Sequence, residues 1–83
     1  MEVKFEWNSA NPNSVLVKGS WDWNNPVQLH KKESGFEGSA FLAPGIYEYG
    51  FEVDGSWQIR KDLQFVQNDS YINNQIEVKP EKR

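Results

Sequence analysis

The stretch Gly45–Trp57, which reads G-I-Y-E-Y-G-F-E-V-D-G-S-W, decides the fold of this chain. Large apolar residues stand at every second position from Tyr47 to Val53, with glutamate or glycine between them. This alternation is typical of a β-strand with one buried face and one solvated face. Asp54-Gly55 then supplies the dipeptide that tight hairpin turns favour. The stretch therefore predicts a central strand and a hairpin, with an indole beside the turn.

The rest of the chain shows the same alternation in shorter segments separated by turn residues. Strands are expected over residues 2–7, 14–18, 27–30, 36–42, 57–59 and 71–79, the last interrupted by a polar run at 73–75. Residues 60–70 are irregular, and we expect them to form a long surface loop that reaches the core once. Short strands at this spacing predict an all-β, antiparallel β-sandwich of about seven strands, with an open barrel as the alternative.

The inward positions of these strands define the expected core. Residues 1–79 form this single domain in our prediction, and residues 80–83 form a charged, disordered tail. Most core side chains would each contribute about 1.5–3 kcal/mol on burial. The expected core residues are Val3, Phe5, Val15, Val17, Trp21, Leu29, Phe36, Tyr47, Tyr49, Phe51, Val53, Ile72, Ile76 and Val78.

Composition excludes several classes of protein. The chain has 83 residues, a formal net charge of −3 and no cysteine. No disulfide or thiolate site can form without cysteine, so a reducing compartment is expected, either the cytoplasm or a plastid. The charges are dispersed, which argues against a nucleic-acid partner. No apolar run is long enough to span a membrane, so no membrane partner is expected either.

Catalytic, cofactor and metal sites are not expected. The single histidine, His30, precedes two lysines and is interpreted as a solvated edge residue. No serine stands in a nucleophile motif. Glu48 and Glu52 alternate with aromatic residues as a solvated sheet face requires, and Asp54 serves its turn. Metal-ligand spacing is absent as well, so the sequence predicts a non-catalytic protein without cofactors.

Aromatic residues carry the functional signal, because the chain has four Trp, three Tyr and five Phe. A sugar ring has an apolar face that stacks on an exposed aromatic ring and a rim of hydroxyls that amides can bond. We predict exposed indoles at Trp23 and Trp57, and core positions for Trp7 and Trp21. The neighbouring amides of Asn73-Asn74 would serve the rim. Composition alone leaves a sugar and a proline-rich peptide as alternative ligands, since both stack on aromatic faces.

Three motifs together resemble a known family. They are G-S-W-D-W at residues 19–23, P-G-x-Y-E-Y-x-F-x-V-D-G-x-W at 44–57 and I-N-N-x-I-x-V at 72–78. The order is similar to that of the family-48 carbohydrate-binding modules, which include the glycogen-binding domain of the AMP-activated protein kinase beta subunit. The resemblance implies an immunoglobulin-like early-set sandwich that binds α-1,4-glucans without catalysis. It also implies attachment to a larger protein, such as a kinase or a glucan-processing enzyme.

The resemblance also implies site residues. Trp57 and Asn73 match the family's positions directly, Trp23 matches if its loop is one residue shorter, and Trp21 replaces a core Phe. The family's Lys, Leu and Thr positions are occupied here by Gly50, Asp69 and Tyr71.

These departures leave three points open. Tyr71 is expected to add a third stacking ring. Gly50 reflects drift, or makes room for a ligand or for a ring such as Tyr71. The alternative function is a sandwich that has lost glucan binding and serves as a protein-interaction module.

Overall fold

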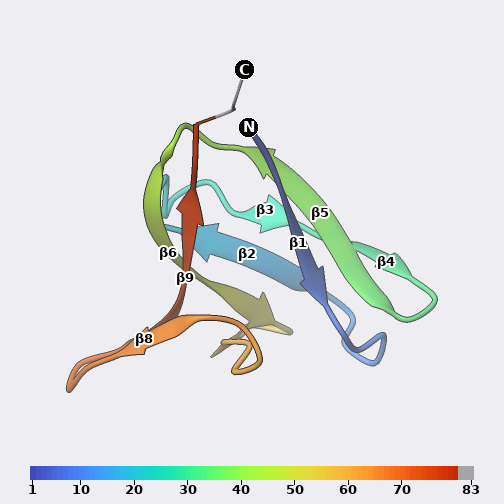
Figure 1. Cartoon of the computed structure of the whole chain (residues 1–83). Helices are drawn as coiled ribbons and strands as arrows, with labels where there is room; N and C mark the ends of the chain where they lie inside the picture. Colours follow the sequence, from blue (N-terminus) through green and yellow to red (C-terminus); the bar gives the residue numbers. More distant parts are fainter. Residues whose placement is uncertain (81–83) are drawn as a thin grey trace.

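The computed structural model describes residues 1–80, so three of the four residues of the predicted tail lie outside the described part. These residues form antiparallel strands in two facing sheets and no helix (Figure 1). The predicted all-β, antiparallel sandwich is therefore confirmed, with nine strands in place of about seven. The strands are β1 (Glu2–Trp7), β2 (Val15–Gly19), β3 (Val27–Gln28), β4 (His30–Lys32), β5 (Gly35–Phe41), β6 (Gly45–Val53), β7 (Ser56–Gln58), β8 (Phe65–Gln67) and β9 (Ile72–Val78).

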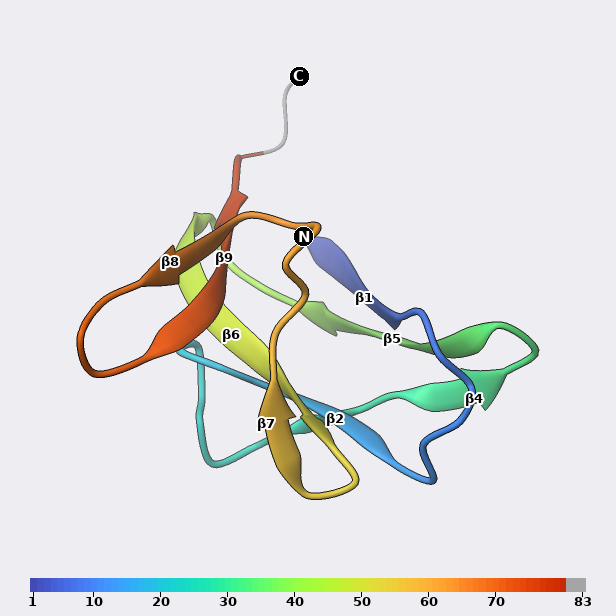
Figure 2. The same cartoon turned by 90° about the horizontal axis from the view of Figure 1, so that it is seen from below.

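The two sheets differ in size. The small sheet has the order β1-β5-β4, and the large sheet has the order β3-β2-β6-β9-β8, with β7 also paired to β6. Figure 2 shows β6 as the central strand of the large sheet, with the β6–β7 hairpin projecting from one end. Residues 1–80 contain no helix of the length and apolar character needed to cross a membrane.

The strand expected over residues 27–30 is two strands in different sheets. β3 pairs with β2 in the large sheet, whereas β4 pairs with β5 in the small one. The chain crosses between the sheets at Leu29, whose side chain is buried and whose N–H donates to the Val15 carbonyl at 3.0 Å. The alternation at 27–30 looked like one strand because Val27 and Leu29 both pack in the core, although Leu29 lies between β3 and β4.

Large rings fill the core between the sheets. Phe5 meets Tyr49 edge to face at 5.2 Å between centroids, and Trp7 lies 5.0 Å from Phe51. Most expected core residues are buried, and the sequence reasoning missed Leu42, which is buried as well. Five residues expected in the core are only partly buried: Trp7, Trp21, Tyr47, Ile72 and Ile76.

The interpretation of residues 60–70 as one long loop was wrong. Residues 65–67 form β8, which pairs with β9 at residues 72–74. We expected Leu63, Phe65 and Val66 to anchor this segment in the core, but Leu63 and Phe65 are each 39% exposed and only Val66 is partly buried. A strand of three residues is too short for its alternation to stand out from the sequence.

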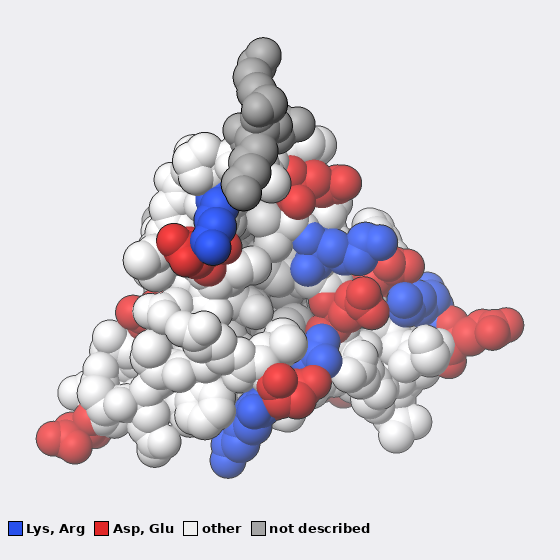
Figure 3. Space-filling view, viewed as in Figure 1, with Lys and Arg blue, Asp and Glu red and all other residues white. Residues whose placement is uncertain are grey.

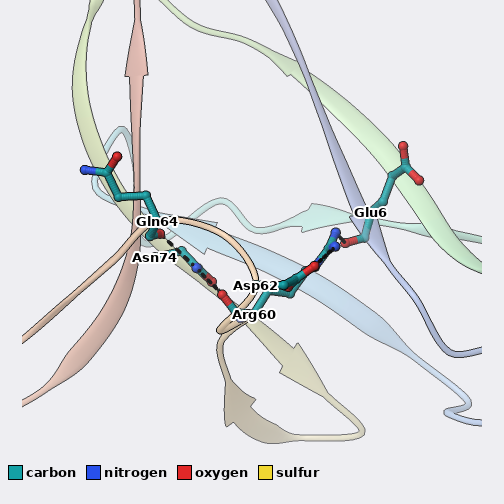
Figure 4. A network of polar contacts seen from close by, with 5 residues as sticks. All are labelled: Glu6, Arg60, Asp62, Gln64 and Asn74. Atoms are coloured by element: carbon teal, nitrogen blue, oxygen red, sulfur yellow. Dashed lines mark hydrogen bonds and ion pairs between the residues drawn. The ribbon is translucent and has the colours of Figure 1, made fainter.

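The side chain of Asn74 holds residues 60–64 in place instead. β9 also runs without a break through residues 73–75, where we expected an interruption. The Asn74 side chain is fully buried. Its Nδ2 donates to the carbonyls of Arg60 at 2.8 Å and Gln64 at 3.1 Å, and its Oδ1 accepts from the Arg60 N–H at 2.9 Å (Figure 4). The Arg60 Nη1 in turn donates to the Glu6 carbonyl at 2.9 Å and so joins the large sheet to β1.

Candidate functional site

Two indoles lie together on the outer face of the large sheet. Trp57 comes from β7 and Trp23 from the loop that follows β2, and their side chains are 42% and 46% exposed. The ring centroids are 6.2 Å apart and the ring planes are inclined by 56°. The sequence therefore predicted two exposed indoles correctly, and the fold brings them into contact.

The hairpin that carries Trp57 is fixed at its turn. Asp54 and Gly55 both have positive φ, at 49° and 86°, as expected for this dipeptide. The Asp54 Oδ1 accepts hydrogen bonds from the N–H groups of Asn13 and Ser14, each at 2.9 Å. These contacts tie the hairpin tip to the chain just before β2, so Trp57 is carried on a braced element.

The loop that carries Trp23 is held by side-chain capping of its own backbone. The Asp22 carboxylate accepts from the N–H of Asn24 at 3.1 Å. At the start of the loop, the Ser20 N–H donates to the Glu48 carbonyl at 2.8 Å and the Ser20 Oγ accepts from the Glu48 N–H at 3.0 Å. The loop is therefore attached to β6 beside the position over which Trp57 lies.

The indole of Trp57 packs directly on Gly50. A Cβ atom at Gly50 would lie only 2.3 Å from Cζ2 of Trp57, so the indole rests against the backbone of β6. The glycine makes room for a ring, as one of our hypotheses held, but the ring is Trp57 and not Tyr71. The missing side chain is thus a packing requirement of the indole.

Polar side chains lie on the same face of β6 and its neighbours. Asn73 of β9 donates from Nδ2 to Oε1 of Glu48 at 3.1 Å. On the other side of β6, Lys18 of β2 pairs with Glu52 at 2.9 Å between Nζ and Oε2. Amide, carboxylate and ammonium groups therefore stand on both sides of Gly50, where Trp57 lies.

Tyr71 is not brought to the indoles. It closes the turn between β8 and β9, where its N–H donates to Oδ1 of Asn68 at 3.0 Å. The ring is exposed, and within residues 1–80 it makes no stacked or edge contact with another aromatic ring. The β8–β9 turn projects away from the β6–β7 hairpin in both views (Figures 1 and 2). Tyr71 is therefore not placed to form a single stacking surface with Trp23 and Trp57.

Two shallow hollows lie elsewhere, between β1 and the segment around Arg60. One has a volume of about 280 Å³ and is bordered by Trp7, Ile59 and Arg60. Figure 3 shows that charges of both signs are interspersed over this side of the molecule. The hydrogen bond between Arg60 and Asp62 raises the pKa of the guanidinium and lowers the pKa of the carboxyl. The Arg60 guanidinium therefore bonds Asp62 and the Glu6 carbonyl within the fold.

The described residues give no sign of a metal centre. Within residues 1–80, no group of three or more His, Cys, Asp or Glu side chains is placed to hold a metal ion. The chemistry available at the indole pair is stacking and hydrogen bonding.

Comparison with known proteins identifies the family of this chain. The sequence profile described as the glycogen recognition site of AMP-activated protein kinase matches residues 1–83. The chain belongs to this family.

Three curated relatives of this chain are plant proteins. The SNF1-related protein kinase regulatory subunit beta-2 of Arabidopsis thaliana is 35% identical over 57 residues, which is 68% of this chain and 20% of the relative. The chloroplastic protein PTST homolog 2 of the same plant is 41% identical over 68 residues, covering 76% and 13%. The chloroplastic protein FLOURY ENDOSPERM 6 of rice, Oryza sativa subsp. japonica, is 38% identical over 72 residues, covering 83% and 14%. The chain thus spans a fifth or less of the length of each.

Sequence reasoning missed two features of this family member. The first is Asn74, which looked like a surface amide beside Asn73 but faces inward, as its register opposite the buried Tyr49 requires. The second is the Lys18–Glu52 pair, which belongs to different strands. The alternation of β2 could have placed Lys18 outward, but only the pairing of β2 with β6 sets it beside Glu52.

Proposed function

We propose that this chain is a non-catalytic module that binds α-1,4-glucans through the Trp23–Trp57 pair. The observation that supports this most directly is the contact between two exposed indoles, with centroids 6.2 Å apart, on a sheet face that also carries polar side chains. Membership of a glycogen-recognition family supports the choice of a glucan over a proline-rich peptide.

The proposed mechanism is stacking of glucose rings on the indoles. Each indole offers a broad apolar face, and the inclination of 56° between the planes suits a ligand that curves from one ring to the next. In this proposal Asn73 bonds sugar hydroxyls beside the rings, in exchange for or in addition to its bond to Glu48. An open surface of this kind gives Kd values in the micromolar to millimolar range, about −8 to −4 kcal/mol.

Tyr71 keeps a secondary place in this proposal. It is exposed on the β8–β9 turn, apart from the indole pair. A long glucan that leaves the Trp23–Trp57 pair could reach it, whereas a short oligosaccharide would not. We therefore assign Tyr71 a contact with polymers only.

The module works as part of a larger protein in this proposal. It carries no catalysis of its own, which a regulatory-subunit relative supports. The parent or partner is a kinase or a glucan-processing enzyme. The chloroplastic relatives support a plastid as the compartment, with the cytoplasm as the other choice. Neither a nucleic acid nor a membrane is a partner in this proposal.

The test is binding to maltoheptaose, a short linear α-1,4-glucan, by isothermal titration calorimetry. Trp57→Ala should abolish measurable binding. Phe41→Ala is the matched control, because Phe41 is an aromatic residue with an 81% exposed side chain on the small sheet. Equal affinity of the two variants, or no binding by the wild type, would refute the proposal.

The second candidate is a protein-interaction module without glucan binding. Phe41 and Ile46 are the observation in its favour, since both are apolar side chains left in solvent, with exposures of 81% and 65%. This alternative gains support if the wild type fails to bind maltoheptaose while retaining its fold by NMR.

A further inference from the structure

The Lys18–Glu52 pair occupies a defined place beside the indoles. The register of β2 against β6 sets Lys18 opposite Gly50, and the register of β6 against β7 sets Glu52 opposite Trp57. Lys18 alternates with the buried Val17 and Gly19, so its side chain is on the outer face. The pair therefore borders the strip of β6 that the Trp57 indole covers.

This ion pair is held in place and is still accessible. Nζ of Lys18 lies 2.9 Å from Oε2 of Glu52, and the two side chains are 32% and 30% exposed. The ammonium has three N–H donors, of which Glu52 takes one. Within residues 1–80, Oε1 of Glu52 accepts no side-chain hydrogen bond. Unused donors and an unused acceptor thus stand side by side at the edge of the ring.

We propose that the Lys18–Glu52 pair is a second hydroxyl-binding element of this site, beside Asn73, and that it supplies the ammonium that Gly50 lacks. This inference rests on the proposed function. Neighbouring hydroxyls of a glucose ring each donate and accept, so one can accept from Nζ of Lys18 while the next donates to Oε1 of Glu52. A lysine at residue 50 would compete with Trp57 for space. A lysine on the next strand avoids that conflict.

The charge around the rings indicates an uncharged ligand. Glu48 bonds Asn73 and Glu52 pairs with Lys18, so two carboxylates and one ammonium lie beside the Trp57 ring. A phosphate on the sugar would meet this excess negative charge. The site should therefore select unmodified glucose units over phosphorylated ones.

The chain offers a matched control for this ion pair. On the outer face of the small sheet, Lys4 reaches Glu37 at 3.9 Å. This pair has the same diagonal geometry, because Lys4 stands opposite Ser39, two residues from Glu37. It has no exposed indole beside it. Glu37 also pairs with Lys32 at 3.5 Å. Lys4→Met therefore measures what loss of a cross-strand ammonium does without loss of a sugar contact, while Glu37 keeps its second partner.

The experiment titrates maltoheptaose into the wild type, Lys18→Met, Lys18→Arg and Lys4→Met. Lys18→Met should weaken binding about tenfold, the low end for a charge-assisted hydrogen bond. Lys18→Arg, which keeps the donors, should recover most of the affinity, and Lys4→Met should match the wild type. In the wild type, the NMR signal of the Lys18 ammonium should shift on binding, which requires no variant to fold. A maltodextrin carrying glucose 6-phosphate should bind more weakly than its unmodified counterpart.

The outcomes separate this inference from the proposed function. No binding by the wild type would overturn both. Wild-type binding that depends on Trp57, with Lys18→Met unchanged and the Lys18 ammonium unmoved, would overturn this inference alone. Tighter binding of the phosphorylated maltodextrin would overturn the selection for uncharged glucose.

Discussion

The effect on stability of replacing Gly50 by alanine should depend on whether Trp57 is present. The new Cβ would lie 2.3 Å from Cζ2 of Trp57. Carbon atoms in contact stand about 3.5–4.0 Å apart, so the indole must retreat by about 1.2–1.7 Å. Such overpacking costs about 1–3 kcal/mol, and we expect the lower end because the half-exposed ring can tilt into solvent.

A second effect of the same substitution has the opposite sign. Gly50 has negative φ, so alanine can adopt its backbone conformation. Replacing glycine in a strand interior should then stabilise the protein by about 0.5–1 kcal/mol. In the wild type the two effects nearly cancel or leave a small loss. In a Trp57→Ala background only the gain remains, so Gly50→Ala should stabilise that protein.

The assay is a double-mutant cycle by urea unfolding of the wild type, both single variants and the double variant. We expect a coupling free energy of about 1 kcal/mol or more between Gly50 and Trp57. Glucan affinity of Gly50→Ala should also fall, since the displaced indole leaves its contact with Trp23. An equal effect of Gly50→Ala in both backgrounds would refute the reasoning that Trp57 lies on Gly50.

Two further predictions concern the neighbouring amides Asn73 and Asn74 and the hydrogen bond between Arg60 and Asp62. Asn74→Ala should lower the unfolding free energy by about 3 kcal/mol, because buried backbone groups of the Arg60 segment lose their partners. Asn73→Ala should cost much less stability in the same urea assay and weaken glucan binding instead; equal losses of stability would contradict the placement of the two amides. The lowered pKa of Asp62 means that its bond to Arg60 stabilises the fold above the carboxyl's ordinary pKa of 3.8 and loses this effect as pH falls through the lower, folded value. Asp62→Asn should therefore make the unfolding free energy depend less on pH in that acidic range, and an unchanged pH profile would show that the bond contributes nothing.

The central strand could be predicted from the sequence because every second residue from Tyr47 to Val53 is large and largely apolar. Its hairpin was equally plain, since Asp-Gly favours one turn geometry. The two exposed indoles followed from their places beside turns. These features depend on local sequence, where alternation and turn chemistry carry information.

The remaining features depend on contacts between distant segments. The sheet crossing at Leu29 involves strands of two and three residues, which show no period of their own. Asn74 looked like a solvated amide because the loop groups that it bonds lie 10 and 14 residues away. The relation of Gly50 to Trp57 required knowing that the indole folds back over β6. Tyr71 adjoined the site in sequence, but the β8–β9 turn carries it elsewhere.

The most direct test of the glucan-binding account is an NMR titration of the wild type with maltoheptaose, observed at the four indole N–H signals. The account predicts that the signals of Trp23 and Trp57 shift together and saturate with one Kd, whereas those of Trp7 and Trp21 stay in place. Unmoved signals at Trp23 and Trp57 at saturating maltoheptaose, or a shift at Trp7 alone, would contradict it.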